Sequence, residues 1–287
     1  MSESKPSVDE LIHAFAAADT LDALPDVVDV LHVAPPNPPE AIQAAFVGSS
    51  YVSAYAEAAS FVRVADQWSG RHRGRGLATS HLIVDFGSGW GRISRFLLAH
   101  VRPSSLLALD VDVLMTALVN STLPGVNTMT VSSFPPTMLR DGIADAFFAF
   151  SVFSHLSPRA HAAWALEFGR LSVPGAMVFL TLLDAAFFDQ VQSAKDAVDG
   201  GEESAFTLAL AGVLPDLRDA RHRYASGEPI YAGVGGGGVR SGDYYGWAVI
   251  PPVFMERTWG EAGFDIVEWV PSGTLFAQAM VALVKRS

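Results

Sequence analysis

The sequence contains no cysteine among its 287 residues. A chain without thiols has no disulfide, no thiolate zinc site and no cysteine nucleophile. Basic residues are also scarce, because 19 lysines and arginines stand against 30 aspartates and glutamates, a formal net charge of −11. Phosphate-rich partners require a broad basic face. We therefore expect no nucleic-acid partner.

Two further absences concern targeting and membranes. No apolar run reaches the roughly 18 residues that a membrane span requires, and the first ten residues, MSESKPSVDE, are polar and unlike a signal peptide. The one basic cluster, at residues 71–75 (RHRGR), is short, and we interpret it as a solvated linker. These features predict a cytoplasmic protein without membrane association, and the chain is half apolar, enough for a large core.

A glycine-rich turn is the most informative feature that is present. Residues 82–98 read LIVDFGSGWGRISRFLL, which predicts a buried strand ending near Asp85, a tight turn and a helix start. Glycines at 87, 89 and 91 let the backbone bend sharply and approach a ligand closely. The free N–H groups at the helix start then face that ligand.

The glycine spacing separates two ligand classes. A dinucleotide fingerprint reads G-x-G-x-x-G, whereas here the third glycine comes one place early and Arg92 holds the sixth position. The pattern D-x-G-x-G-x-G resembles motif I of class I S-adenosylmethionine-dependent methyltransferases. In that family the loop holds the methionine part of the cofactor and its ribose. A glycine turn without a ligand is the alternative, because short motifs give false positives.

A second apolar run, residues 105–109, ends in Asp110, about twenty residues beyond the loop. A carboxylate there can accept two hydrogen bonds from ribose hydroxyls. Nicotinamide proteins share this role, so Asp110 indicates a ribose without selecting the cofactor. Many family members also present an acid to the adenine after strand three. This chain has Ser133 and Phe134 there, and we expect Ser133 or a backbone carbonyl to make that contact.

Residues 144–158, ADAFFAFSVFSHLSP, resemble the strand-four motif of the same family. Ser157 and Pro158 form a helix start, with serine as N-cap and proline at the first helical position. His155 is the candidate catalytic base, because imidazole titrates near neutrality. The alternative is that His155 orients the loop or contacts the cofactor.

The resemblance covers roughly residues 79–184 and 246–287. It implies an α/β, three-layer Rossmann-like methyltransferase fold, with a seven-stranded, mostly parallel sheet whose last strand inserts antiparallel. We expect a helical N-terminal cap at residues 1–78, with a turn at Gly48, and a methyltransferase domain at 79–287. In that domain residues 171–175 close a helix before a fifth strand at 176–183, and the final strand covers 274–284. The implied cofactor is S-adenosyl-L-methionine, with S-adenosyl-L-homocysteine as product, and no metal is expected. The residues assigned to the cofactor are Asp85, Gly87, Ser88, Gly89, Gly91, Arg92, Asp110, Val111, Ser133, Phe134, Ser151 and Phe153.

Residues 184–245 interrupt the predicted sheet, and we expect them to form a substrate lid. The run GVGGGG at 233–238 predicts a mobile loop. It leads to Tyr244 and Tyr245, which suit a hydroxylated or ring-bearing small molecule. Tyr51 and Tyr55 lie one helical turn apart and either face the acceptor or pack within the helix layer.

The sequence thus favours O-methylation of a small hydroxylated acceptor, either sugar- or glycan-like or a natural product. A similar Y-G-x-A-x-I-P stretch occurs in methyltransferases associated with glycan or sugar modification. Two alternatives remain: a nicotinamide-dependent oxidoreductase and a non-catalytic protein that binds S-adenosylmethionine. The oligomeric state and the identity of the acceptor are not predicted.

Overall fold

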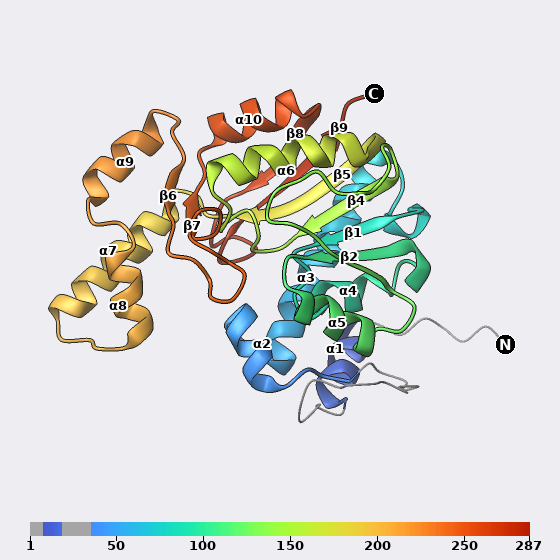
Figure 1. Cartoon of the computed structure of the whole chain (residues 1–287), viewed down its shortest axis with the longest axis horizontal. Coiled ribbons are helices and arrows are strands. Elements are labelled where there is room, and N and C mark those ends of the chain that lie inside the picture. Colours follow the sequence, from blue (N-terminus) through green and yellow to red (C-terminus); the bar gives the residue numbers. More distant parts are fainter. Residues whose placement is uncertain (1–7, 19–35) are drawn as a thin grey trace. The chain divides into compact units, whose positions relative to one another are not determined.

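The computed structural model describes residues 8–18 and 36–287, which form two compact units (Figure 1). The first unit comprises the described residues up to 132 together with 143–149 and 175–177. The second comprises 133–142, 150–174 and 178–287. Within the first unit helix α3 (Tyr51–Arg73) packs on α4 (Arg92–Leu97), and the division into a cap at residues 1–78 and a domain at 79–287 stays a prediction.

The first unit alternates short strands with helices. In chain order its elements are α1 (Val8–Ala17), α2 (Glu40–Val47), α3, the 3₁₀ turn η1 (Leu77–Thr79), β1 (Ile83–Phe86), α4, η2 (Pro103–Ser105), β2 (Leu106–Asp110), α5 (Val113–Thr122), β3 (Asn127–Thr130) and β4 (Ala144–Ala149). Every residue of β1, β2 and β4 is buried. Continuous apolar runs of this kind are typical of parallel strands covered on both faces.

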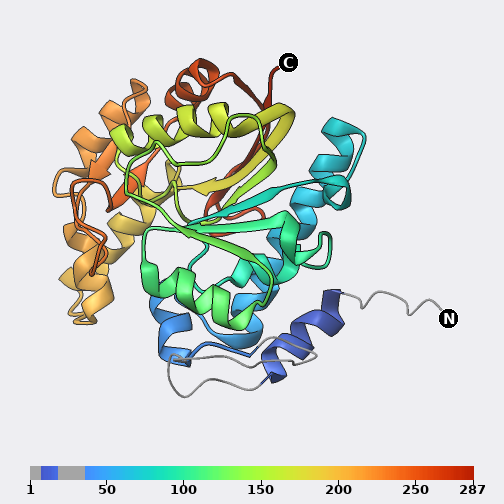
Figure 2. The same cartoon turned by 45° about the vertical axis from the view of Figure 1, so that its right-hand side comes forward.

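The helices before β1 follow the predicted pattern where they are described. A turn was expected at Gly48, and this glycine ends α2 in the left-handed conformation, with φ of 77°. The helices α1 and α2, drawn in blue in Figure 2, each pack against α3. The described start of α1 is Val8, so the polar N-terminus before it lies outside the described residues.

The basic cluster at residues 71–75 is exposed to solvent as the sequence predicted, except at Arg73, but its first three residues belong to a helix and not to a linker. Residues 71–73 form the last turn of α3, and the side chain of Arg73 is only 4% exposed. Its guanidinium lies 3.5 Å from the carboxylate of Asp145 on β4, which also accepts hydrogen bonds from the N–H groups of His81 and Leu82. This buried ion pair fastens the end of α3 to the start of β4.

The second unit contains most of the remaining elements. They are α6 (Pro158–Leu171), α7 (Ala186–Asp199), α8 (Ala205–Gly212), α9 (Leu217–Ala225), β6 (Ile230–Ala232), β7 (Trp247–Val249), α10 (Pro252–Glu261), β8 (Phe264–Val270) and β9 (Ala279–Lys285). Ser157 caps α6 as predicted, because its hydroxyl oxygen accepts from the N–H of Ala160.

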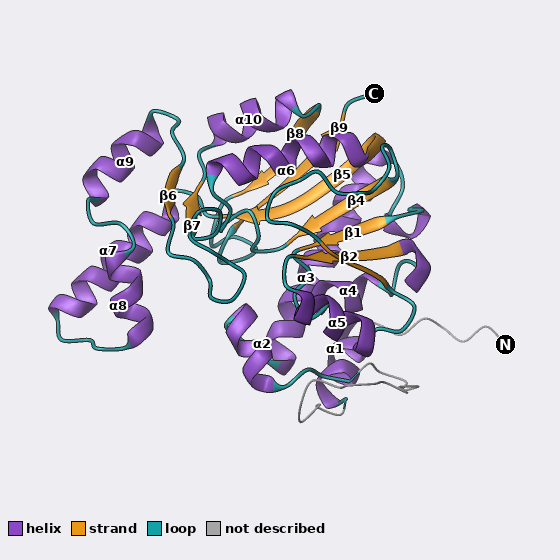
Figure 3. Ribbon diagram, in the orientation of Figure 1, coloured by secondary structure: helices purple, strands orange, loops and turns teal. Residues whose placement is uncertain are grey.

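Seven strands form one sheet in the order β3-β2-β1-β4-β5-β9-β8, where β5 is Ser172–Leu182. The first three strands and β4 pair in parallel, and β9 runs antiparallel to β8. The last strand therefore lies inside the sheet beside β8, as predicted. With its flanking helices the sheet has the predicted Rossmann-like architecture (Figure 3).

Two strand boundaries differ from the sequence-based expectation. Residues 171–175 were predicted to close a helix before a strand at 176, but β5 already starts at Ser172 and includes Gly175, with φ of 73°. The final strand was predicted from residue 274 and starts at Ala279. At Ser172 strand pairing overrides the break that proline and glycine indicated, whereas before β9 the turn that begins at Pro271 continues to Gln278.

The insertion at residues 184–245 has a small core of its own. Its helices α7 and α9 pack around Phe187, Phe188 and Val191, which are almost completely buried. The short strands β6 and β7 pair antiparallel beside these helices (Figure 3). In the part of the chain that the structure describes, no helix combines the length and apolar character of a membrane span.

Candidate active site

The glycine-rich turn joins β1 to α4 through a left-handed backbone. Gly87, Gly89 and Gly91 have φ angles of 68°, 52° and 85°, a region that side-chain-bearing residues adopt at a cost. A methyl group on Gly91 would also lie 3.0 Å from Leu123 and 3.2 Å from Val119. The turn predicted from the sequence therefore requires glycine for both its conformation and its packing.

The turn is tied to the carboxyl end of β2. The N–H groups of Gly87 and Ser88 both donate to the carbonyl oxygen of Leu109. The N–H of Gly89 donates to Asp110 Oδ2 at 2.8 Å, and the N–H of Asp112 donates to Oδ1 at 2.9 Å. These bonds fix the Asp110 carboxylate beside the glycine turn, where a ribose contact was predicted.

Two polar atoms of the turn are buried and have no hydrogen-bond partner among the described residues: Ser88 Oγ and Trp90 Nε1. A buried polar group without a partner costs free energy. A bound ligand that hydrogen-bonds to these atoms would remove that cost. The turn is thus chemically suited to a cofactor with polar groups, such as S-adenosylmethionine.

Asp85, at the end of β1, is also buried. It accepts a hydrogen bond of 2.6 Å from the Ser94 hydroxyl on α4. Burial raises the pKa of Asp85 to about 6, and the Ser94 hydrogen bonds oppose that rise. The aspartate that opens the glycine motif therefore links β1 to the first turn of α4.

Several residues assigned to ligands have protein partners in the first unit. Arg92 is 6% exposed, and its guanidinium forms an ion pair of 2.5 Å with Glu57 on α3. Tyr55 is completely buried against Trp90 and Phe96, and its hydroxyl donates to Asn37. Tyr55 therefore packs in the interior, which was the alternative considered for this helix face.

Two other candidates in the first unit are more accessible. Val111 is half-buried directly after Asp110, and Tyr51 is half-buried at the first position of α3. Tyr51 has φ of 47°, and its N–H donates to Gln43 Oε1. Their roles toward a ligand stay predictions.

His155 lies after β4 in the second unit, and its contacts define its protonation. Nδ1 lies 2.7 Å from the carbonyl oxygen of Gly246. A carbonyl oxygen only accepts, so Nδ1 carries the ring proton, and in the neutral ring Nε2 is an acceptor. Burial lowers the pKa of His155, and the charge of Arg240 lowers it further. The ring is therefore neutral at pH 7, with a lone pair on Nε2.

Tyr245, which the sequence analysis singled out, lies next to this histidine, as do Trp247, Arg240 and Gln278, which it did not. The ring of Tyr245 stacks on His155 with 4.9 Å between ring centres, the Trp247 ring lies tilted against His155, and the Arg240 guanidinium lies over the Tyr245 ring. Gln278, directly before β9, donates to Ser151 Oγ at 2.8 Å. No local pattern marks Gln278, because its partner lies 127 residues earlier in the chain.

The glycine run at 233–238, for which the sequence predicted a mobile loop, makes backbone hydrogen bonds to the segment that follows it. The N–H of Gly235 donates to the carbonyl oxygen of Tyr245, and that of Gly236 donates to Arg240. A methyl group on Gly236 would lie 2.6 Å from the Tyr245 ring. The glycines allow two backbone segments to approach closely, so the run forms a packed hairpin that leads to Tyr245.

Other predicted residues of the second unit lie within packed surroundings. Phe153 is completely buried against His161, Phe168 and Trp259. Tyr244 is 3% exposed, and its hydroxyl donates to the carbonyl oxygen of Val239. The structure thus brings together Ser151, His155 and Tyr245, whereas Phe153 belongs to an aromatic core.

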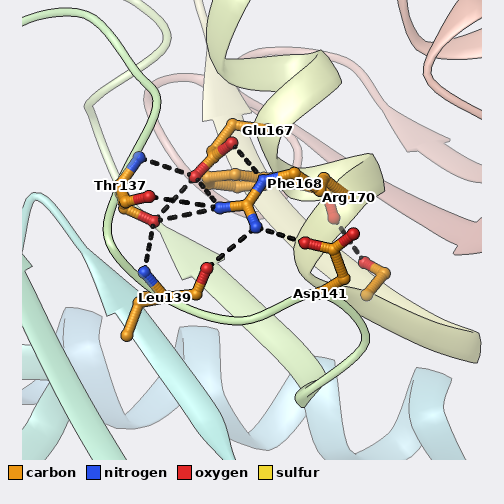
Figure 4. Close-up of polar contacts among 7 residues, drawn as sticks. Thr137, Leu139, Asp141, Glu167, Phe168 and Arg170 are labelled. Atoms are coloured by element: carbon orange, nitrogen blue, oxygen red, sulfur yellow. Dashed lines mark hydrogen bonds and ion pairs between the residues drawn. The ribbon is translucent and has the colours of Figure 1, made fainter.

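The segment that carries Ser133 and Phe134 is held by α6. Trp164 Nε1 donates to the carbonyl oxygen of Ser133 at 3.0 Å. Farther along, Arg170 donates to Glu167, to Asp141 and to the carbonyl oxygen of Leu139 (Figure 4). Glu167 accepts in turn from the N–H and hydroxyl of Thr137. This network fixes the loop at residues 133–142, while the adenine contact of Ser133 stays a prediction.

No family model matches the chain, and no curated protein matches its sequence. A sugar N-methyltransferase from Streptoalloteichus sp ATCC 53650 is similar in structure, with 11% identity over 80% of this chain and 88% of that chain and a TM-score of 0.51. Magnesium protoporphyrin IX methyltransferase from Synechocystis PCC 6803, solved with SAH, has 13% identity over 80% and 86% of the two chains and a TM-score of 0.48.

A third similar structure is 1,6-didemethyltoxoflavin-N1-methyltransferase from Burkholderia thailandensis, with 14% identity over 91% and 94% of the two chains and a TM-score of 0.46. At these identities the likeness is one of fold. The strand order and the likeness to the sugar N-methyltransferase show that this chain has the Rossmann-like fold of class I S-adenosylmethionine-dependent methyltransferases.

Proposed function

We propose that this protein transfers a methyl group from S-adenosylmethionine to a hydroxyl group of a small acceptor. The observation that carries the proposal is the glycine turn of the first unit. It holds the Asp110 carboxylate at the end of β2 and leaves Ser88 Oγ and Trp90 Nε1 buried without partners. A nucleotide-like cofactor with ribose hydroxyls and polar amino-acid groups matches these atoms.

In this proposal the residues of the first unit bind the cofactor. Asp110 binds the ribose hydroxyls, and the backbone of the turn accommodates the cofactor because its glycines lack side chains. Bound S-adenosylmethionine supplies an activated methyl group on its sulfonium. The protein aligns the acceptor and excludes water, and such alignment supplies several kcal/mol of a reaction barrier.

His155 serves as the base in this proposal. The acceptor hydroxyl loses its proton as the new carbon–oxygen bond forms, and Nε2 of His155 takes that proton. Nε2 is available because Nδ1 is committed to the carbonyl oxygen of Gly246. The lowered pKa keeps the ring unprotonated near neutral pH, as a base must be.

The acceptor class follows from the groups around His155. The aromatic rings of Tyr245 and Trp247 lie against His155, beside the polar groups of Ser151 and Arg240. Aromatic faces next to hydrogen-bonding groups suit a sugar-like or ring-bearing hydroxylated molecule. The similar sugar N-methyltransferase shares the fold, and we propose a sugar-like acceptor for this protein as well. In this proposal the insertion at residues 184–245 covers the acceptor, and the protein acts in the cytoplasm.

Calorimetric titration and a turnover assay test the proposal. S-adenosylhomocysteine is expected to bind and raise the unfolding temperature, whereas a nicotinamide dinucleotide is expected to do neither. Release of S-adenosylhomocysteine is then measured with a panel of sugars, amino sugars and phenols. Binding without turnover on any acceptor would favour a non-catalytic binding protein, and preferential turnover of amino sugars would replace O- with N-methylation.

A further inference from the structure

Gln278 lies between two hydroxyl groups whose hydrogen bonds fix the direction of its amide. Thr181 is completely buried, and its Oγ1 accepts from the N–H of Ser151 at 2.7 Å. The Thr181 hydroxyl proton therefore needs another acceptor, and Gln278 Oε1 lies 2.7 Å away. With the amide oxygen on Thr181, the amide nitrogen Nε2 points to Ser151 and donates to its Oγ at 2.8 Å.

The hydroxyl proton of Ser151 then has two neighbouring acceptors. Ser151 Oγ lies 3.4 Å from Ser154 Oγ and 3.5 Å from His155 Nε2. From the other side, the Gly246 carbonyl holds the proton of His155 on Nδ1 and leaves Nε2 as an acceptor. The chain of hydrogen bonds thus places a donor hydroxyl next to an acceptor nitrogen.

We propose that Gln278 is a positioning residue that directs the Ser151 hydroxyl toward His155 Nε2, so that Nε2 stays unprotonated until the acceptor hydroxyl replaces Ser151 as its hydrogen-bond donor and Ser151 turns to Ser154. The inference rests on the proposed function, in which His155 takes the acceptor proton. Gln278 acts through Ser151 and does not touch the reacting atoms. Its donation to Ser151 Oγ polarises the hydroxyl and strengthens it as a donor.

Two charged or titratable groups, Tyr245 and Arg240, also lie near His155. Tyr245 stacks on the ring, and the Arg240 guanidinium lies 5.7 Å from the centre of the Tyr245 ring. Both belong to the hairpin of the insertion and are unchanged by substitution of Gln278. A change in the titration of His155 in such a variant therefore reports on the path through Ser151.

The test is imidazole ¹⁵N NMR of the full chain, with His155→Gln used to assign the His155 signals. The unmodified protein is expected to show the Nδ1–H tautomer of His155. Gln278→Glu replaces the donor by an acceptor, which draws the Ser151 hydroxyl away from Nε2 and adds a negative charge. The apparent pKa of His155 is then expected to rise by about one pH unit.

Two further variants make the test specific. Gln278→Met removes both hydrogen bonds without adding charge, and a smaller rise in the pKa of His155 is expected. Gln192→Glu adds the same charge on the exposed surface of α7 and is expected to leave His155 unchanged. An Nε2–H tautomer in the unmodified protein, or an unchanged titration in both Gln278 variants, would overturn the proposal.

Binding of S-adenosylhomocysteine separates this inference from the proposed function. If the unmodified protein does not bind it, the methyltransferase proposal fails, whatever the NMR shows. If it binds and His155 titrates identically in all variants, the positioning role of Gln278 fails alone. Once an acceptor is known, Gln278→Glu is expected to move the acidic limb of the pH–rate profile upward by the same amount.

Discussion

The amide of Gly89 donates a 2.8 Å hydrogen bond to the carboxylate of Asp110, 21 residues later in the chain. This bond joins the glycine turn to the end of β2, so the two features that the sequence indicated separately form one structure. A ligand that binds to either residue therefore also changes the position of the other. Substitutions at these two positions are therefore the most direct tests of the cofactor site.

Asp110→Ala is expected to weaken S-adenosylhomocysteine binding by about 2–3 kcal/mol, because a charged hydrogen-bond acceptor for the ribose is lost. Isothermal titration calorimetry measures this loss. Asp112→Ala is the matched control, since Asp112 caps α5 by accepting from the N–H of Leu114. The control is expected to lower stability by about 1 kcal/mol with near-normal affinity. Equal affinities of the two variants would remove Asp110 from the site.

Gly89→Ala is expected to abolish measurable cofactor binding and to destabilise the fold only slightly. A left-handed φ of 52° costs a side-chain-bearing residue about 1–2 kcal/mol, and the methyl group enters the space beside the turn. Gly142→Ala carries the same backbone strain at φ of 60°, where an added methyl group meets nothing within 4 Å. Thermal unfolding should respond similarly in both variants, and calorimetry should detect a loss only at position 89.

Arg73→Ala is expected to destabilise the protein by about 2 kcal/mol, because the buried Asp145 carboxylate loses its ion pair and keeps only the N–H groups of His81 and Leu82 and the more exposed Arg75. Arg75 also lies near Asp145, at 3.7 Å, but its side chain is 43% exposed. Arg75→Ala should therefore cost less than about 1 kcal/mol. Chemical denaturation compares the two, and an equal loss would mean that the Arg73–Asp145 pair does not fasten α3 to β4.

The raised pKa of Asp85 predicts a specific pH dependence of stability. The folded protein holds this proton up to about pH 6, whereas the unfolded chain releases it near the ordinary value of 3.8. Stability contributed by this group is therefore lost as the pH rises from about 4 to 6 and stays constant above. Asp85→Asn should remove this loss, which is about 3 kcal/mol for a shift of this size.

His161 acts in the opposite direction within the same range of pH. It is completely buried, and burial lowers its pKa to about 3, so its neutral form is lost from the folded state only in strong acid. Its stabilising contribution falls as the pH drops below 6.5. The test therefore compares the free energy of unfolding of Asp85→Asn with that of the unmodified protein. Both are measured by chemical denaturation at several pH values from 4 to 7. A difference that does not change with pH would contradict the burial of an ionised Asp85.

Gly236→Ala is expected to displace Tyr245 from His155, because the added methyl group would lie 2.6 Å from the Tyr245 ring. The ring-current shift of the His155 protons in NMR should decrease, while S-adenosylhomocysteine binding stays near normal. Gly237→Ala, where a methyl group meets nothing within 4 Å, controls for general disturbance of the hairpin. Identical spectra of both variants would show that the hairpin does not hold the stack.

Local patterns in the sequence predicted much of this fold. The runs at β1 and β2 are continuously apolar, Ser157 and Pro158 carry the N-cap signature of α6, and the glycine turn has the spacing of a ligand loop. Each of these patterns involves residues only a few positions apart, so the amino-acid sequence alone is enough to predict the element. The seven-stranded, mostly parallel sheet with an antiparallel last strand was predicted because the resemblance to a known family implied it.

Only the tertiary structure decided which side chains meet. Arg73 and Asp145 are 72 residues apart, His155 and Gly246 are 91 apart, and Ser151 and Gln278 are 127 apart. No periodicity or capping rule connects such positions, which explains why the basic cluster was read as a linker and Gln278 was not noticed. The glycine run at 233–238 makes the same point: glycine permits both a mobile loop and a close backbone approach, and the packing against Tyr245 selects the second.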